Sequence, residues 1–102
     1  MKKVHLPKGL LELYLLSILN SYPAKGIEII ESVKKNTDGG WVPSAGSIYP
    51  LLKKLESQGF IYKVSSDNRY VITEKGKERI QELKEEALEI QKIIEKILNS
   101  LS

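Results

Sequence analysis

The sequence predicts a mainly α fold of the α+β class, with a helical head, a two-stranded β-hairpin and a long C-terminal helix. Apolar residues recur at helical spacing in four segments. Two short runs rich in β-branched and aromatic residues lie between the third and the fourth segment. A chain of 102 residues is large enough for one modest hydrophobic core. We expect a head over residues 1–73 and a helix over residues 74–102.

The first helix is predicted over residues 9–20, which are apolar on nearly every side. A helix of this kind is buried on more than one side, so we expect it to contact something beyond its own small head. Tyr22 precedes Pro23, and a residue before proline is pushed away from helical geometry, which ends the helix there.

A second helix is predicted over residues 26–35. The spacing of Ile27, Ile30 and Val33 predicts that these three side chains point inward. Residues 36–40, with the sequence NTDGG, form a loop because Asn, Asp and Gly favour turns over helix.

The third helix lies within residues 43–61 and carries the most information about function. Ser44 or Ser47 can serve as its N-cap, and Gly59 lies where a helix commonly ends. The residues that share its core-facing stripe are Ile48, Leu51, Leu52 and Leu55. The opposite face carries Gly46, Tyr49, Pro50, Lys53 and Ser57, with Ser47 and Lys54 on one flank. A face this polar is unsuited to a core, and it suits a DNA-recognition helix.

Pro50 has two interpretations, which depend on the N-cap. A proline inside a helix lacks an N–H, and its ring meets the carbonyl four residues earlier, that of Gly46. If Ser47 is the cap, Pro50 falls in the first turn and costs little. If Ser44 is the cap, we expect a kink or a looser first turn.

A β-hairpin is predicted over residues 60–64 and 69–73, joined by the polar residues 65–68. A hairpin directly after a recognition helix is the wing of a winged helix. The predicted fold is therefore a winged helix-turn-helix with a long C-terminal helix.

Residues 46–61, GSIYPLLKKLESQGFI, resemble the signature of the PadR family of transcriptional regulators. In that family a Gly-Ser/Thr-Ile-Tyr-Pro run opens the recognition helix and a Leu-Glu-x-x-Gly-Leu/Phe-Ile run closes it. Residues 10–19 resemble the family's first helix, residues 24–29 its Gly-Tyr-Glu-Ile segment, and residues 68–76 its Lys/Arg-Tyr-Tyr-x-Leu-Thr-x-x-Gly strand and turn. The resemblance implies a winged helix-turn-helix repressor that acts as a dimer on double-stranded DNA.

The chain departs from many family members in two places. Its wing tip is short and lacks the Gly, Pro and Arg of longer tips, which argues against deep minor-groove insertion and leaves Lys63 and Arg69 as expected phosphate contacts. Trp41, the only tryptophan, precedes the recognition helix. We expect it to anchor that loop to the core rather than to stack on a ligand. The family resemblance also implies an effector, such as a small molecule, that the sequence does not identify.

The C-terminal helix, over residues 74–101, keeps one apolar seam along its length. Its members, three or four residues apart, are Ile80, Leu83, Ala87, Ile90, Ile94, Ile97 and Leu101. This spacing faces a partner helix, so we predict a homodimer whose interface also includes Leu11 and Leu15 of the first helix. The alternative is a helix folded back on its own head, but about 28 residues at about 1.5 Å each span about 40 Å, longer than so small a head needs.

Each exposed residue of the recognition helix has an expected role at DNA. Ser44, Gly46 and Ser47, with the backbone N–H groups of the helix start, suit a phosphate oxygen. Lys53 and Lys54 would attract phosphate, and Lys53 could reach a guanine edge. Two interpretations of Tyr49 remain, contact with DNA or packing on the second helix. A twofold dimer would bind a pseudo-palindrome with half-sites about one helical turn, roughly 34 Å, apart.

Enzymatic and metal-dependent functions are disfavoured by the residues present. The chain has no cysteine and one histidine, His5, which is close to the N-terminus and is expected to be an exposed bystander. No nucleophile has a placed base, so we expect no catalytic site, no metal and no cofactor. The glutamates of residues 78–89 alternate with lysines and an arginine, as in a solvated, salt-bridged helix face. A winged helix used only for protein contact remains the rival to DNA binding.

Charge is distributed unevenly along the chain. The net charge is +3 overall. Residues 1–73 hold ten Lys/Arg and six Asp/Glu, whereas residues 74–102 hold six and seven. A basic head joined to a near-neutral helix suits a DNA-binding module with a separate dimerisation arm, although chance placement of solvated lysines would give the same tally. The sequence shows no signal peptide and no transmembrane run, so we expect a cytoplasmic protein.

Overall fold

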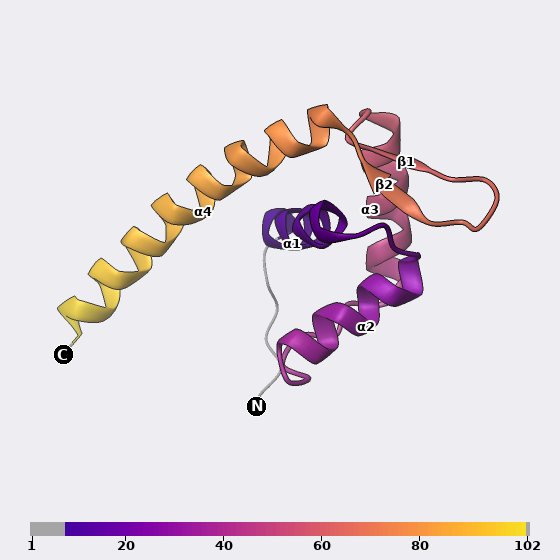
Figure 1. The fold of residues 1–102 in the computed structure, drawn as a ribbon. Helices are drawn as coiled ribbons and strands as arrows, with labels where there is room; N and C mark the ends of the chain where they lie inside the picture. Colours follow the sequence, from indigo (N-terminus) through magenta and orange to yellow (C-terminus); the bar gives the residue numbers. More distant parts are fainter. Residues whose placement is uncertain (1–7, 102) are drawn as a thin grey trace.

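The structure is a computed structural model that describes residues 8–101, and it has the predicted winged helix-turn-helix fold (Figure 1). The elements follow in the order α1 (Lys8–Ser21), α2 (Gly26–Asn36), α3 (Ala45–Ser57), β1 (Ile61–Lys63), β2 (Tyr70–Ile72) and α4 (Glu74–Ser100). The three short helices and the hairpin form a head, and α4 leads away from it. The molecule measures 54 by 28 by 21 Å.

Helix α1 lies at the centre of the head. Leu15 and Leu16 have no exposed surface, and Leu11, Ile18 and Leu19 are buried beside them. The helix packs against α2, β2 and α4. These three neighbours explain why the helix is apolar on nearly every side, because together they bury most of its apolar residues.

Helix α2 buries a different stripe from the one predicted. Ile29 and Val33 are fully buried and Ile30 is partly buried, whereas Ile27 is 55% exposed. The inward placement of Ile27 was therefore wrong. Helix α3 packs across the start of α2 on the side of Gly26, and Ile29 and Val33 follow Gly26 at helical spacing on that side. Ile27 comes one residue after Gly26, so its side chain points about 100° away from the side that α3 covers.

Helix α3 begins at Ser44, which settles the choice between the two candidate caps. The Ser44 Oγ accepts a hydrogen bond from the Ser47 N–H at 3.2 Å. Pro50 consequently lies inside a helix that continues to Ser57, and the carbonyl of Gly46 receives no N–H from it. Gly59, at a φ of +81°, ends the helix. There the N–H of Phe60 donates to the Leu55 carbonyl, and that of Gly59 to the Glu56 carbonyl, which is the Schellman arrangement.

The wing is a short antiparallel hairpin in which Ile61 pairs with Ile72 and Lys63 with Tyr70. Its turn ends at Asn68, whose φ of +62° is tolerated by Asn better than by most residues. A backbone bridge joins the link between α1 and α2 to the sheet. The N–H of Tyr70 donates to the Ala24 carbonyl at 2.8 Å, and the reverse bond measures 3.2 Å. The wing is thereby tied to the segment that leads into α2.

Helix α4 is joined to the wing by a tight first turn. The Thr73 Oγ1 accepts a hydrogen bond from the Gly76 N–H at 3.1 Å, as an N-cap does, and its hydroxyl donates to the Gly59 carbonyl at 2.7 Å. A Cβ added to Gly76 would lie 2.2 Å from the carbonyl oxygen of Phe60. Only glycine allows this approach of α4 to Phe60, the residue before β1, which explains the Thr-x-x-Gly pattern at this junction.

The first half of α4 then packs along α1. Leu83 is buried and Ile80 partly so. The Arg79 Nε donates to the Oε1 of Glu12, a nearly buried carboxylate of α1, at 3.2 Å. This hydrogen bond, with a second one to Glu82, raises the pKa of the Arg79 guanidinium. One face of α4 is thus fixed to the head by both apolar and charged contacts.

We predict that Gly76→Ala destabilises the fold, because the new methyl group must displace the backbone of Phe60. The expected loss is about 1–3 kcal/mol in the free energy of unfolding. Gly9→Ala is the matched control, since nothing lies within 4 Å of its added Cβ. Thermal unfolding of both variants at one protein concentration checks this. Equal melting temperatures for the two would refute the close approach at Gly76.

Candidate nucleic-acid interface

The outer face of α3 is a continuous polar surface. It consists of Gly46, Ser47, Tyr49, Pro50, Lys53, Lys54 and Ser57, all of which are exposed. Ile48, Leu52 and Leu55 are fully buried on the opposite side of the same helix. The structure therefore brings together on one helix face the exposed α3 residues singled out from the sequence.

The start of α3 offers unpaired backbone donors. The first N–H groups of a helix have no carbonyl partner within it, and the helix dipole makes this end favourable for anions. Ser44 already serves the helix, because its Oγ caps the Ser47 N–H and its hydroxyl lies 3.2 Å from the Ser47 Oγ. The backbone at Ala45 and Gly46 is therefore better suited to an anionic oxygen than the Ser44 side chain.

Tyr49 combines the two interpretations that the sequence left open. Its ring packs on α2, because a Cβ added to Gly26 would lie 2.6 Å from the Tyr49 Cε1. The side chain is nevertheless 47% exposed. Gly26 was not singled out as a site residue, although its place at the start of α2 opposite an aromatic residue was a signal that a close approach was needed. The absence of a side chain at Gly26 sets the position of the Tyr49 ring.

The lysines of α3 extend the surface toward the end of the helix. Lys53 follows Tyr49 by four residues and therefore lies on the same face, and Lys54 lies on its flank. Both are exposed. Their ammonium groups make this face positive, and the exposed Glu56, three residues after Lys53, places one carboxylate at its edge beside Tyr49.

The wing carries two cations in different surroundings. The Lys63 Nζ lies 5.9 Å from the centre of the Tyr70 ring. The Arg69 Nη1 donates to the Oδ2 of Asp67 at 2.8 Å, and its Nε lies 3.9 Å from the Oε1 of Glu28 on α2. Arg69, an expected phosphate contact, is thus already paired with carboxylates. The spacing of an aspartate two residues before an arginine in a turn was a usable signal for the first pair.

Hydrogen bonds around Asp67 shift the pKa values of both partners. The backbone N–H of Arg69 donates to the Asp67 Oδ1 at 3.1 Å, and this bond, followed by the one from the guanidinium, lowers the pKa of Asp67. The same pairing raises the pKa of Arg69. Burial raises the pKa of Tyr70, whose ring supports Lys63. Asp67 and Arg69 are therefore both charged at neutral pH.

Trp41 anchors the loop before α3, as predicted. Its indole packs edge-on to the ring of Tyr14 in α1, next to the core, with 5.9 Å between the ring centres. Its backbone N–H donates to the Thr37 Oγ1 at 3.0 Å. The loop that precedes the candidate interface is thus held to α1 by the indole and to the end of α2 by its backbone.

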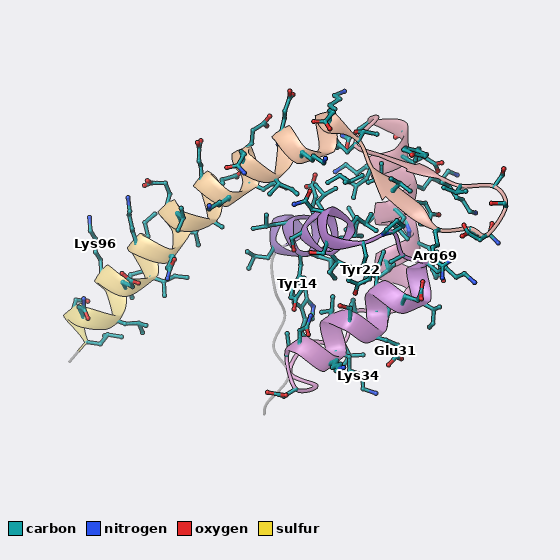
Figure 2. All side chains as sticks on the ribbon, in the orientation of Figure 1. Tyr14, Tyr22, Glu31, Lys34, Arg69 and Lys96 are labelled. Carbon is teal, nitrogen blue, oxygen red and sulfur yellow. The ribbon has the colours of Figure 1, made fainter. Side chains whose placement is uncertain are left out.

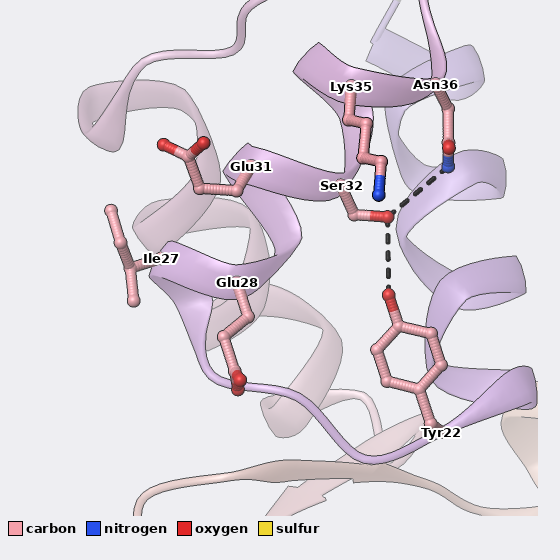
Figure 3. A pocket seen from close by; sticks show the side chains of 7 residues that line it. All are labelled: Tyr22, Ile27, Glu28, Glu31, Ser32, Lys35 and Asn36. Atoms are coloured by element: carbon pink, nitrogen blue, oxygen red, sulfur yellow. Dashed lines mark hydrogen bonds between the residues drawn. The ribbon is translucent and has the colours of Figure 1, made fainter.

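An open hollow lies on the outer side of α2 (Figure 3). It is lined by Tyr22, Ile27, Glu28, Glu31, Ser32, Lys35 and Asn36. The Tyr22 hydroxyl and the Asn36 amide both bond to the Ser32 Oγ, which links the segment after α1 to α2. Within residues 8–101, no group of three His, Cys, Asp or Glu could hold a metal ion. His5 lies outside the described residues.

The predicted dimerisation residues fall into two sets. Leu11, Leu15 and Leu83 are buried in the chain's own core, so the expectation that they meet a partner directly needs correction. Ile80 and Ala87 are partly buried. The exposed apolar residues of the far half of α4 and of its C-cap, here called the α4 stripe, are Leu88, Ile90, Ile93, Ile94, Ile97, Leu98 and Leu101. Figure 2 shows this half of the helix, with Lys96, standing clear of the head.

Three helices followed by a hairpin, with a polar outer face on the third helix, define a winged helix-turn-helix module of the kind found in transcriptional regulators. Residues 15–82 match the transcriptional regulator PadR-like family, and the chain belongs to that family. The resemblance inferred from the sequence is thereby confirmed. This family is one of transcriptional regulators, which are generally not enzymes.

Individual relatives agree with the family match. The chain is 32% identical over 81 residues to the transcriptional regulator YqjI of Escherichia coli, a match that covers 76% of this chain and 39% of YqjI. A transcriptional regulator from Clostridium thermocellum is 27% identical, with a TM-score of 0.80 over 86% of this chain and 92% of that one. A PadR-like regulator from Bacillus cereus is 32% identical, with a TM-score of 0.71 over 89% and 93%.

We predict that Gly26→Ala moves the Tyr49 ring outward with little loss of stability, because the atoms in its way belong to the far end of a flexible side chain. The measurement is the set of nuclear Overhauser contacts between the Tyr49 ring and residue 26 and its neighbours. Loss of these contacts in a folded variant is the expected result. Retained contacts together with a large fall in melting temperature would contradict it.

Proposed function

We propose that this protein is a cytoplasmic repressor that binds double-stranded DNA in a sequence-specific way, as a homodimer on a pseudo-palindromic operator. The observation that supports it most is the exposed face of α3, which carries Tyr49, Lys53 and Lys54 while the opposite face is buried. A helix of this kind fits a major groove. Over residues 8–101, no helix is long and apolar enough to cross a membrane.

Helix α3 would enter the major groove with its N-terminal half against the backbone. The free N–H groups near Ala45 and Gly46, beside Ser44 and Ser47, would bind one phosphate. Lys53 would reach toward a base edge or a phosphate and Lys54 toward a phosphate. Tyr49, held by Gly26, would place its exposed edge against the DNA. Lys63 of the wing would contact the flanking backbone.

The α4 stripe would form the dimer interface. Apolar side chains from Leu88 to Leu101 cover several turns of a helix that leaves the head, and a contiguous exposed patch of this kind marks an interaction site. A twofold partner would bury it against its own copy. The two heads would then lie on half-sites about one helical turn, roughly 34 Å, apart. The chain would thus divide into a DNA-binding head, residues 1–73, and a dimerisation helix, residues 74–102.

We predict that Lys53→Ala and Tyr49→Ala each weaken DNA binding without unfolding the protein. The expected loss is about 1–3 kcal/mol of binding free energy for a base contact, and less for a phosphate contact. Fluorescence anisotropy with the DNA upstream of the protein's own gene and with a scrambled duplex, across a salt series, measures it. Lys96→Ala is the control, since it removes the same charge from the far half of α4 (Figure 2).

The outcomes separate the proposal from its rival. Tighter binding to the upstream DNA, with log affinity falling steeply against log salt, supports a sequence-reading regulator. Equal, salt-sensitive binding to both duplexes supports a DNA-binding surface and points to another operator. No binding to either duplex at low salt would favour a winged helix that contacts proteins.

We predict that Ile90→Glu together with Ile94→Glu produces monomers, because two charges would be buried in the proposed interface. Lys92→Glu is the matched control. It changes the net charge by the same two units on the side of α4 that faces away from Ile90 and Ile94, where Lys92 pairs with the exposed Glu89. Sedimentation equilibrium gives the mass of each variant. An unchanged mass for the double variant would place the interface elsewhere.

A further inference from the structure

Arg69 is the only arginine that precedes α4, and it lies on the wing. A guanidinium offers five donors in a planar fork and binds phosphate in a bidentate way, which the ammonium of Lys63 cannot do. In a head whose other cations are lysines, Arg69 is the side chain best suited to the DNA backbone. Its surroundings therefore determine how strongly the wing binds.

Two carboxylates already contact this guanidinium. Asp67 accepts from the Nη1 at 2.8 Å and also from the Arg69 backbone N–H at 3.1 Å. Glu28 approaches the Nε to 3.9 Å from the start of α2. Figure 2 shows Arg69 where the wing meets α2. Two negative groups thus face this guanidinium. Lys25, just before α2, also attracts the Asp67 carboxylate, and Lys63 supplies the only other positive charge of the hairpin, residues 61–72.

The two carboxylates differ in what else they hold. Glu28 also caps a helix, whereas Asp67 acts within the wing. The Glu28 Oε1 accepts from the Lys25 backbone N–H at 2.8 Å and so caps α2. Among residues 8–101, the hydrogen bonds of Asp67 stay within the wing, to the backbone and side chain of Arg69. An asparagine at position 67 would retain the oxygen that holds the turn and lose the charge that holds the guanidinium.

The ion pair between Asp67 and Arg69 is easily exchanged. Each side chain is 41% exposed, and ion pairs at this level of exposure contribute little to stability because water and salt screen them. A DNA phosphate offers the guanidinium an equivalent anionic partner. Arg69 can therefore leave Asp67 for a DNA phosphate. The Asp67 carboxylate, however, stays close to the DNA backbone and repels the phosphate.

We propose that Asp67 competes with DNA phosphate for Arg69 and thereby lowers the affinity of the wing for the DNA backbone. Asp67 is a positioning residue in this account, since it acts through Arg69. The inference rests on the proposed DNA-binding function. Phosphate contacts carry no sequence information, so a wing weakened in this way leaves a larger share of the binding free energy to base contacts from α3.

The test compares Asp67→Asn with wild type on the upstream and the scrambled duplex by fluorescence anisotropy across a salt series. We expect about threefold to tenfold tighter binding to both duplexes at low salt, and a slope of log affinity against log salt steeper by about 0.9 for one added phosphate contact. Glu86→Gln, which removes a carboxylate from exposed α4, is the control for net charge.

Arg69→Ala decides whether the effect acts through the arginine. In that background we expect Asp67→Asn to change the affinity no more than Glu86→Gln does. An equal gain with and without Arg69, an equal gain from Glu86→Gln, or no gain at all would overturn the inference while leaving wild-type binding intact. Failure of the wild type to bind either duplex at low salt would overturn the proposed function and this inference together.

Discussion

The burial of α1 is the constraint on which the rest of the structure depends. Leu15 and Leu16 have no contact with water, and α2, β2 and α4 each cover part of the helix. Removal of this apolar surface from water is the main favourable contribution to such a small core. Because all three neighbours pack on one helix, their relative positions are fixed together. The wing and α2 are therefore held in a constant relation, and α3 is held with them because it packs against α2 and β1.

The outer face of α3 depends on this arrangement in an indirect way. Ile48, Leu52 and Leu55 anchor α3 to the core, which leaves its polar residues no alternative but solvent or a ligand. The backbone bridge between Ala24 and Tyr70 ties the wing to the segment that leads into α2. Gly26 at the start of α2 then receives the Tyr49 ring. Residues that belong to the fold thus set the geometry of residues that are exposed for function.

Features that rest on local chemistry could be predicted from the sequence, and features that rest on tertiary packing could not. Ser44 as one of two candidate caps, Gly59 as the helix end and the hairpin after it follow from backbone preferences of a few residues. The phase of α2 was misjudged because Ile27, Ile29 and Ile30 allow two stripes, and only the packing of α3 selects one. The pairing of Arg69 with Glu28 joins segments far apart in the chain, so no local spacing reveals it. The division of the apolar residues of α4 between the core and the exposed stripe likewise depends on how far α4 packs along α1.

The tight junction at Gly76 makes α4 a lever arm. A helix of 27 residues is about 40 Å long, so a rotation of about 10° at its first turn would displace its far end by about 7 Å. The angle is set over the first turns, by the close approach of Gly76 to Phe60, by the ion pair of Arg79 with Glu12 and by the burial of Leu83. Sub-ångström differences in packing at the first turns of α4 therefore become differences of several ångströms at its C-terminal end. Related chains with the same head could direct the far half of α4 to quite different positions by changing only the side chains around its first turns.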